Sequence, residues 1–313
     1  MAHAQGIGSL AVGCIGLVFG VVATGSYYKY KEFLQQKSAV LLRYSPELPT
    51  ESRIDLDVNF GLVYDRRNRI PLWTIEHLTR ETIKPGIDVD RGKSNFCEDN
   101  NIHPFFRSSN ADYAGMSSSG YDRGHLVPAA NHRHSQHSMN NTFFLSNIAP
   151  QVGEGFNRDK WSHLERYVRA LVKYYANLWV VSGPIFLPRR EQDGKLYMKY
   201  EMIGANQVAV PTHFFKIIIG RTKDSHIDVL SYMLPNAPID NDVPLETFLV
   251  PVDVLERNAG FLITNKFSKQ DLRYINQPLP IDFKLFPPGQ RRNSLPSPLP
   301  PQATLSEPSS SDV

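Results

Sequence analysis

The sequence is poor in cysteine, because its 313 residues include only Cys14 and Cys97. Two cysteines can build neither a disulfide framework nor a cysteine zinc site, and Cys14 lies in an apolar segment. We therefore expect Cys97 to be a reduced thiol.

A strong charge of one sign is also lacking, since the formal net charge is +3 at pH 7. This excludes a histone-like protein that binds nucleic acid through dense positive charge, although an anionic partner remains allowed. With 41% hydrophobic and 21% charged residues, the composition is that of a globular protein long enough to bury a sizeable core.

Charged residues are absent from Ile7 to Tyr28, a length that spans the roughly 30 Å hydrocarbon layer of a membrane as a helix. A secretory signal peptide would begin with basic residues, and a mitochondrial presequence would be rich in arginine; both are missing, although no acidic residue precedes Glu32. A membrane anchor, retained or later lost, fits best. We expect residues 1–31 to form a targeting or anchor segment that contacts a membrane through residues 7–28, and residues 32–59 to form a linker.

The C-terminal end has little to bury. Nine of the 23 prolines lie between Pro278 and Pro308, and the surrounding sequence is rich in serine. Such a composition is typical of disordered segments. We expect residues 266–313 to form a disordered tail.

The middle of the chain contains runs of β-branched and aromatic residues, which favour strands. The expected strands cover residues 61–65, 70–78, 178–186, 207–219 and 227–234. From Asp159 onward, Trp161, Leu164, Val168, Leu171, Val172 and Tyr175 follow the spacing of a helix that turns one face to a core. A second helix is expected from Leu245 to Arg257, limited or kinked by Pro251. These elements predict an α+β domain over residues 60–265, with a mainly antiparallel sheet flanked by helices.

The run DRGH places Asp122, Arg123, Gly124 and His125 side by side. Histidine titrates near neutral pH and is the best candidate for a general base, while the arginine fork suits a phosphate. A glycine lets the backbone turn closely beside the histidine. A polar surface turn is the alternative interpretation, so the run needs support from other residues.

Such support lies downstream, where Asn147, Asn157 and Glu165 precede or lie on the expected helix. Hard divalent ions prefer oxygen ligands, and Mg²⁺ keeps several waters while taking only one or two protein ligands. Asn157 could be such a ligand, with Glu165 holding a metal-bound water. An asparagine at a helix start is also a common cap, and that alternative stays open.

Four stretches then carry a resemblance: DRGHLVPAANH, TFFLSNIAPQVGEGFNRDKWSHLE, VVSGPIFLPR and VAVPTHFFK. Over roughly residues 62 to 260 the chain resembles the nonspecific DNA/RNA nucleases of the ββα-metal superfamily, most closely the mitochondrial endonucleases among them. The resemblance implies the ββα-metal nuclease fold. It also implies Mg²⁺-dependent, sugar-nonspecific hydrolysis of DNA and RNA to 5′-phosphate and 3′-hydroxyl ends, with Mn²⁺ as a possible substitute.

The resemblance assigns roles to individual residues. It makes His125 the general base and Asn157 the direct metal ligand. The other catalytic residues that it implies are Glu165, which holds the water shell of the metal, Asn147, which supports the histidine, and Asp122 and Arg123 of the DRGH signature. Related nucleases often have a basic residue near the stretch that reads GKSNFCEDN here, whereas this chain has Cys97 in that neighbourhood and only Arg91 and Lys93 just before that cysteine.

Other polar residues have competing interpretations. Arg133, Arg158 and Lys160 are candidates for contacts to a nucleic-acid backbone, although each could be a solvated charge. His132, His134 and His137 are spaced loosely like zinc ligands but lack cysteine or carboxylate partners at ligand spacing, so we expect a solvated polar segment and no zinc. Trp161 lies on the apolar stripe of the expected helix and is more consistent with the core than with base stacking.

The resemblance further implies a homodimer, a mitochondrial location in the intermembrane space or at the inner membrane, and movement to the nucleus on release. Apoptotic DNA fragmentation or mitochondrial DNA turnover would be the corresponding processes. Two alternatives remain: a related mitochondrial exonuclease-like enzyme, and a nucleic-acid-binding protein that has lost catalysis.

Overall fold

The computed structural model describes residues 59–115, 120–222, 226–267 and 272–275, together with Lys29 and Lys31. The expected membrane segment at residues 7–28, nearly all of the expected linker, and the tail beyond residue 275 lie outside the described residues. Within the described ranges, no helix is long and apolar enough to cross a membrane.

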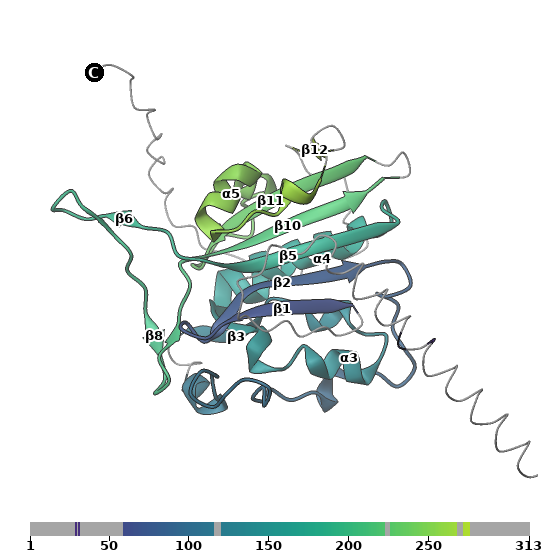
Figure 1. Ribbon diagram of the computed structural model, residues 1–313, viewed down its shortest axis with the longest axis horizontal. Helices are drawn as coiled ribbons and strands as arrows, with labels where there is room; N and C mark the ends of the chain where they lie inside the picture. Colours follow the sequence, from purple (N-terminus) through teal and green to yellow (C-terminus); the bar gives the residue numbers. More distant parts are fainter. Residues whose placement is uncertain are drawn as a thin grey trace, which may run out of the picture. The chain divides into compact units, whose positions relative to one another are not determined.

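A six-stranded sheet forms the centre of the domain (Figure 1). Its strands lie in the order β1, β2, β5, β10, β11, β12. All neighbours run antiparallel except β11 and β12, which pair in parallel. The strands are β1 (Phe60–Asp65), β2 (Ile70–Leu78), β5 (Asn177–Ile185), β10 (His213–Arg221), β11 (Ile227–Pro235) and β12 (Leu272–Tyr274). The expected α+β class with a mainly antiparallel sheet is confirmed.

One face of the sheet packs against helix α5 (Val252–Ala259), which lies in front of the strands in Figure 1. Alternate residues of the strands point to this face because side chains alternate along a strand. They form a hydrophobic cluster with Val252 and Leu255 of α5, and its largest members are Trp73, Trp179 and Phe215. We refer to this side of the sheet as the α5 face.

The opposite face packs against helix α4 (Ser162–Leu171), drawn behind the sheet in Figure 1. Aromatic contacts join them: the ring centroids of Tyr167 and Tyr232 are 6.3 Å apart, and those of Trp161 and Phe214 are 5.8 Å apart. All six residues of the predicted helical stripe are buried. This α4 face also buries three charged strand residues, Glu76, Lys216 and Asp228.

The remaining elements surround this sheet. Strands β3 (Tyr121–His125) and β4 (Ile148–Val152) form a separate antiparallel ribbon. A π-helical segment, Gly153–Trp161, follows β4 and leads into α4. Two further ribbons pair β6 (Arg189–Arg190) with β7 (Leu196–Tyr197), and β8 (Met202–Ile203) with β9 (Val208–Ala209). The short helices are α3 (Gln136–Asn141) and single 3-10 turns at Arg91–Lys93, Asn110–Tyr113, Ala129–Asn131, Leu145–Asn147, Leu245–Phe248 and Thr264–Lys266.

Proline explains two differences from the expected elements. The strand expected over residues 207–219 is divided into β9 and β10, with Pro211 between them. The helix expected over residues 245–257 is a 3-10 turn and a separate helix α5 that begins directly after Pro251. Proline has no N–H for a ladder or helix hydrogen bond, but it is well suited to the start of a helix.

The expected boundary of the tail at residue 266 is wrong for one short segment. Residues Leu272–Tyr274 form β12, and the N–H of Ile275 donates to the Val229 carbonyl at 3.0 Å. Arg273 forms an ion pair with the buried Asp228 at 2.6 Å. This segment therefore closes the edge of the sheet beside β11.

Candidate active site

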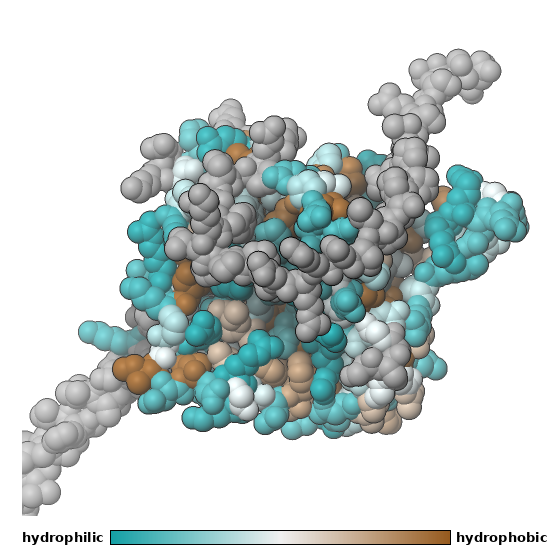
Figure 2. Space-filling model, turned by 180° about the vertical axis from the view of Figure 1, so that it is seen from behind, coloured by the Kyte–Doolittle hydropathy of each residue, from teal (hydrophilic) through white to brown (hydrophobic). Residues whose placement is uncertain are grey.

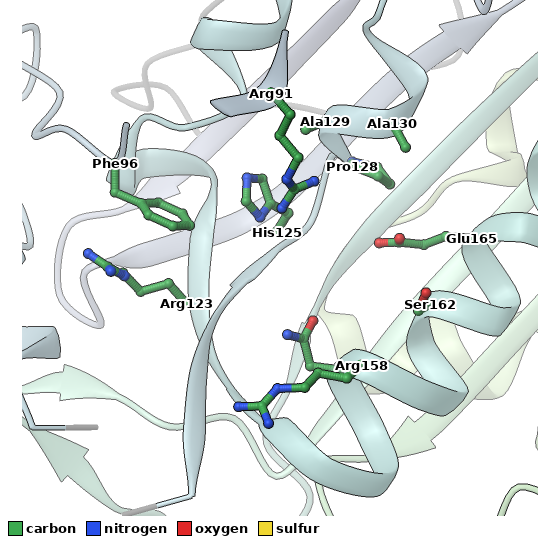
Figure 3. Close-up of a pocket in the computed structure, with 11 residues that line it drawn as sticks. Arg91, Phe96, Arg123, His125, Pro128, Ala129, Ala130, Arg158, Ser162 and Glu165 are labelled. Carbon is green, nitrogen blue, oxygen red and sulfur yellow. The ribbon is translucent and has the colours of Figure 1, made fainter. Parts of the chain in front are cut away.

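A polar pocket lies where the β3–β4 ribbon meets the π-helical segment and the start of α4 (Figure 3). It brings together the predicted residues Arg123, His125, Asn157, Arg158 and Glu165, which come from two separate stretches of the sequence. The complete lining is Arg91, Phe96, Arg123, His125, Pro128, Ala129, Ala130, Asn157, Arg158, Ser162 and Glu165. Asp122 lies immediately outside this lining and contacts two of its members.

His125 ends strand β3 and packs between two aromatic rings. Its ring centroid lies 5.3 Å from that of Phe96 and 4.8 Å from that of Phe143. The Nε2 atom is buried and has no hydrogen-bond partner among the described residues. Burial, with a smaller contribution from the nearby Arg91 cation, lowers the pKa of His125 to about 3. The imidazole is therefore neutral at pH 7, which is the protonation state in which a general base begins the reaction.

Gly124 is required by a close approach of the two ribbon strands. A Cβ atom at this position would lie 2.2 Å from Cδ and Oε1 of Gln151, which is fully buried. Real Cβ atoms do not approach other atoms so closely, so the absence of a side chain at position 124 lets Gln151 pack directly behind His125. The glycine of the DRGH run is a packing requirement of the ribbon.

Asp122 organises the lower edge of the pocket. Its carboxylate accepts a hydrogen bond from Asn157 Nδ2 at 2.8 Å and two from Arg158, from Nε at 2.9 Å and from Nη2 at 2.6 Å. Burial raises the pKa of Asp122, but these hydrogen bonds outweigh it and hold the pKa below its usual value. Because a carboxylate can only accept, the amide nitrogen of Asn157 must face Asp122, which leaves Oδ1 free for another partner.

Glu165 comes from the first turn of α4, and its carboxylate points into the pocket (Figure 3). Burial raises the pKa of Glu165, while the cations of Lys216 and Arg169 oppose this effect. Ser162 lies one helical turn earlier on the same side. The carboxylate and the Asn157 amide thus line the same pocket, as expected.

Buried charges support this wall of the pocket from the α4 face. Lys216 Nζ donates to Ser182 Oγ at 2.6 Å and lies 4.5 Å from the ring centroid of Trp161. Nearby, Asn131 joins two charged groups, since its Nδ2 donates to Glu76 Oε2 at 2.8 Å and its Oδ1 accepts from Arg169 Nη1 at 3.1 Å. None of these supporting residues is among the site residues predicted from the sequence.

Arg91 and Arg123 provide positive charge near His125. Arg123 is exposed, lies 4.3 Å from the ring centroid of Phe96 and donates to Asn110 Oδ1 at 3.0 Å. Figure 3 places Arg91 beside His125, on the opposite side from Arg158. Of the two basic residues near the GKSNFCEDN stretch, Arg91 lines the pocket and Lys93 does not.

Two candidate residues, Asn147 and Arg133, lie outside the lining of the pocket. Asn147 is fully buried, and its side chain makes three hydrogen bonds: Nδ2 donates to Val127 O at 3.0 Å and to Thr142 O at 2.8 Å, while Oδ1 accepts from Val127 N at 3.0 Å. It fixes the loop after His125 and does not line the pocket. Arg133 is exposed and also outside the lining.

The proposed backbone contact at Lys160 is wrong. This side chain is fully buried, and its Nζ donates to two main-chain carbonyls, those of Asn241 at 3.0 Å and Val243 at 2.5 Å. A buried ammonium requires such partners, and they remove Lys160 from any substrate surface. Arg158, in contrast, has a side chain that is 62% exposed at the pocket.

The donor set of the pocket fits a hard, mostly hydrated cation. No group of three histidine, cysteine or acidic residues suitable for a metal ion occurs in the described parts of the chain. Mg²⁺ does not need such a group, because it can be bound by one or two oxygen ligands and keep several waters. Asn157 Oδ1 and the Glu165 carboxylate are oxygens of this kind.

Comparisons with known proteins show which family and which structures the chain is similar to. Residues 38–270 match the sequence model of the family described as DNA/RNA non-specific endonuclease. Mitochondrial endonuclease G of Homo sapiens is 48% identical over 215 residues, which cover 69% of this chain and 70% of that protein. The mitochondrial nuclease of Saccharomyces cerevisiae is 40% identical over 253 residues, with coverages of 74% and 76%. A solved structure of the EndoG/EndoGI complex matches with a TM-score of 0.72 and 48% identity, covering 77% of this chain and 96% of that one.

Proposed function

The chain belongs to the family of DNA/RNA non-specific endonucleases, and from this premise we propose that its pocket hydrolyses phosphodiester bonds of DNA and RNA with the help of bound Mg²⁺. The observation that carries the proposal is the convergence of a neutral, partly buried His125 with Asn157, Glu165 and the arginines in one pocket. Neither phosphate-directed arginines nor an amide ligand reads a base, which is consistent with cleavage that is independent of sequence.

His125 acts as the general base. Its Nε2 is buried, so Nδ1 is the nitrogen that can receive a proton from water in the pocket. For this, the neutral ring must carry its hydrogen on Nε2. The Trp161 indole donates to the main-chain carbonyl of His125 at 3.4 Å and connects the strand to the wall formed by α4. The packing against Phe96 and Phe143 keeps the ring in place.

Asn157 and Glu165 would hold Mg²⁺, the first directly through Oδ1 and the second through water. The cation, when bound, would neutralise negative charge on the phosphate and on the departing oxygen. Asp122 is a positioning residue that turns the Asn157 amide, and it also anchors Arg158. Arg91 and Arg123 would stabilise the phosphate oxygens as charge accumulates.

The balance of the reaction gives its products. Water attacks phosphorus as one of its protons passes to His125, the bond from phosphorus to the 3′ oxygen breaks, and this oxygen takes up a proton from solvent water. The products would then carry a 5′-phosphate and a 3′-hydroxyl. Mn²⁺ is chemically close enough to replace Mg²⁺, since both are bound by oxygen ligands.

The decisive experiment is cleavage of closed circular plasmid and of RNA by the purified chain with Mg²⁺. We expect nicking of the circle, which an obligate exonuclease cannot achieve, and a loss of at least about 100-fold in rate for His125→Ala. His137→Ala is the matched control, because His137 is exposed and outside the pocket. Intact circles, or equal rates for the two variants, would refute the proposal.

We also propose a mitochondrial location, supported by the names of the relatives from Homo sapiens and Saccharomyces cerevisiae, a mitochondrial endonuclease G and a mitochondrial nuclease. The intermembrane space or inner membrane, movement to the nucleus, a homodimer, and a part in apoptotic DNA fragmentation or mitochondrial DNA turnover belong to the same proposal. Imaging a fusion of residues 1–45 to a fluorescent protein tests the location. A signal in the secretory pathway would contradict it.

A further inference from the structure

Two exposed phenylalanines lie on the loop that precedes the pocket. Phe105 is 76% exposed and Phe106 is 40% exposed. The described surface in Figure 2 is mainly hydrophilic, with hydrophobic side chains in small separate patches. His103 lies beside Phe105 and Phe106, as does the β1–β2 turn with Arg66 and Arg67. We call these five residues the aromatic-arginine patch.

The side chains of the patch are held together by contacts between the two loops. The His103 ring centroid lies 4.7 Å from that of Phe105 and 5.8 Å from that of Phe106. Arg66 Cζ lies 6.0 Å from the Phe106 ring centroid, and Arg69 Nη2 donates to the Phe105 carbonyl at 3.4 Å. The exposed rings of Phe105 and Phe106 therefore lie beside guanidinium groups and are held in place by these contacts.

The positive charge of the patch is available to a ligand. Arg66 and Arg67 are exposed, and neither forms an ion pair with a described residue. The neighbouring Asp65 is occupied by the turn, where it accepts hydrogen bonds from Arg67 N at 2.9 Å, Asn68 N at 3.1 Å and Asn68 Nδ2 at 2.7 Å. An anionic partner would meet two unpaired cations here.

The same loop continues from the patch to the edge of the pocket. After Phe106, Ser108 N donates to Tyr64 Oη at 3.2 Å, and Asn110 then accepts a hydrogen bond from the pocket residue Arg123. Four residues of extended chain span at most about 14 Å. Because one strand of DNA rises about 3.4 Å per nucleotide, a substrate strand in the pocket reaches the patch within about five nucleotides.

We propose that the aromatic-arginine patch is a second substrate site, on which Phe105 and Phe106 stack unpaired bases of single-stranded DNA or RNA while Arg66 and Arg67 bind the backbone. The inference rests on the proposed nuclease function. Sequence-tolerant binding of single strands combines aromatic platforms with positive charge, which is the composition of this patch. A membrane surface would meet the same charges, but the continuity with a nucleic-acid pocket favours the substrate.

The test compares binding of a labelled 12-nucleotide single strand and a 12-base-pair duplex by fluorescence anisotropy, using the full-length chain with His125→Ala to prevent cleavage. We expect Phe105→Ala/Phe106→Ala to weaken binding of the single strand about tenfold, the loss expected for about one stacked base. Duplex binding should change less than twofold, because paired bases are already stacked. Ile87→Ala is the matched control, since Ile87 is 93% exposed and outside the patch.

Two further variants separate stacking from other causes. Phe105→Trp/Phe106→Trp should retain single-strand binding, whereas Phe105→Leu/Phe106→Leu should lose it although the surface remains apolar. Arg66→Gln/Arg67→Gln should lower the slope of log K against log salt by about 1.4, as expected for two phosphate contacts on a single strand. Unchanged single-strand binding in the double alanine variant, or full binding by the leucine variant, would overturn the proposal.

Plasmid nicking by chains that retain His125 distinguishes failure of the second substrate site from failure of the proposed nuclease function. If the wild-type chain fails to nick plasmid, the nuclease assignment itself is wrong. If both the wild type and Phe105→Ala/Phe106→Ala nick plasmid equally and have the same KM for single strands, only the second site is refuted. Sedimentation with anionic vesicles completes the test: loss of vesicle binding with unchanged oligonucleotide binding would assign the patch to a membrane.

Discussion

The Asp122→Asn variant tests whether orientation of a single amide controls metal binding. The Asp122 carboxylate accepts three hydrogen bonds, one from Asn157 and two from Arg158. An asparagine at this position has nearly the same shape but only one acceptor oxygen. Its oxygen can accept at most two of the three hydrogen bonds, and its amide nitrogen would face a donor of Asn157 or Arg158. We expect the Asn157 amide to lose its fixed orientation.

The size of the effect follows from the two partners. The Arg158 side chain is 62% exposed, and an ion pair with so exposed a partner contributes about 0 to 1 kcal/mol. The larger effect falls on Asn157, because loss of a residue that orients a metal ligand lowers metal affinity or activity by about 10- to 100-fold. This corresponds to about 1.4 to 2.8 kcal/mol.

The assay is plasmid nicking as a function of Mg²⁺ concentration. For Asp122→Asn we expect the half-saturating Mg²⁺ concentration to rise about 10- to 100-fold, with most of the rate recovered at saturating metal. Arg158→Ala serves as the control and should raise the half-saturating Mg²⁺ concentration less than about threefold. Calorimetric titration with Mn²⁺ gives an independent measure of affinity. Unchanged half-saturation in Asp122→Asn, or an equal effect in Arg158→Ala, would refute the reasoning.

Other variants test the histidine and its surroundings. Burial lowers the pKa of His125 to about 3, so neutral His125 contributes its full share of the folding stability above its unfolded pKa of about 6.5, and this share is lost as the pH falls towards 3. In chemical denaturation, the difference in unfolding free energy between the wild type and His125→Asn should therefore shrink by up to about 1.4 kcal/mol per pH unit in that window. A difference that stays constant with pH would contradict this expectation. Asn147→Ala removes three buried hydrogen bonds and should lower the free energy of unfolding by about 3 kcal/mol. Calorimetry should show a Tm that is lower by roughly 6–12 °C. A Tm within about 2 °C of the wild type would show that the loop after His125 does not depend on Asn147. Gly124→Ala should cost about 1 to 3 kcal/mol through overpacking against Gln151 and reduce nicking at saturating Mg²⁺; a stable, fully active variant would disprove the packing requirement.

The sequence predicted the core of the fold well where periodicity determines burial. The stripe from Trp161 to Tyr175 identified helical residues that are buried, and the runs of β-branched and aromatic residues located the strands. The order of the strands could not be predicted in this way, because the pairing of β2 with β5 joins segments about 100 residues apart. Proline positions indicated where elements are interrupted, although not how short the resulting pieces are.

Individual site residues were predictable only where local sequence defines their surroundings. His125, Asn157 and Glu165 belong to recognisable stretches and meet in one pocket. Lys160 resembles a surface cation in sequence, but the carbonyls that bind it come from residues more than 80 positions later. Arg91 had no feature that distinguished it from Lys93, because only the folded loop places one of these two side chains beside His125.

Substitutions on the two faces of the sheet would affect different properties of the protein, namely thermal stability on one face and activity on the other. On the α5 face the cluster consists of hydrophobic side chains, and new substitutions there would act on thermal tolerance alone. On the α4 face, the buried Lys216 and Glu76 lie behind the wall of the pocket that carries Glu165. Replacing such buried charges with apolar groups often increases stability at the expense of activity. A search for a heat-resistant enzyme should therefore randomise the α5 face and leave the α4 face unchanged. The same division would allow the two faces to evolve at different rates within one domain.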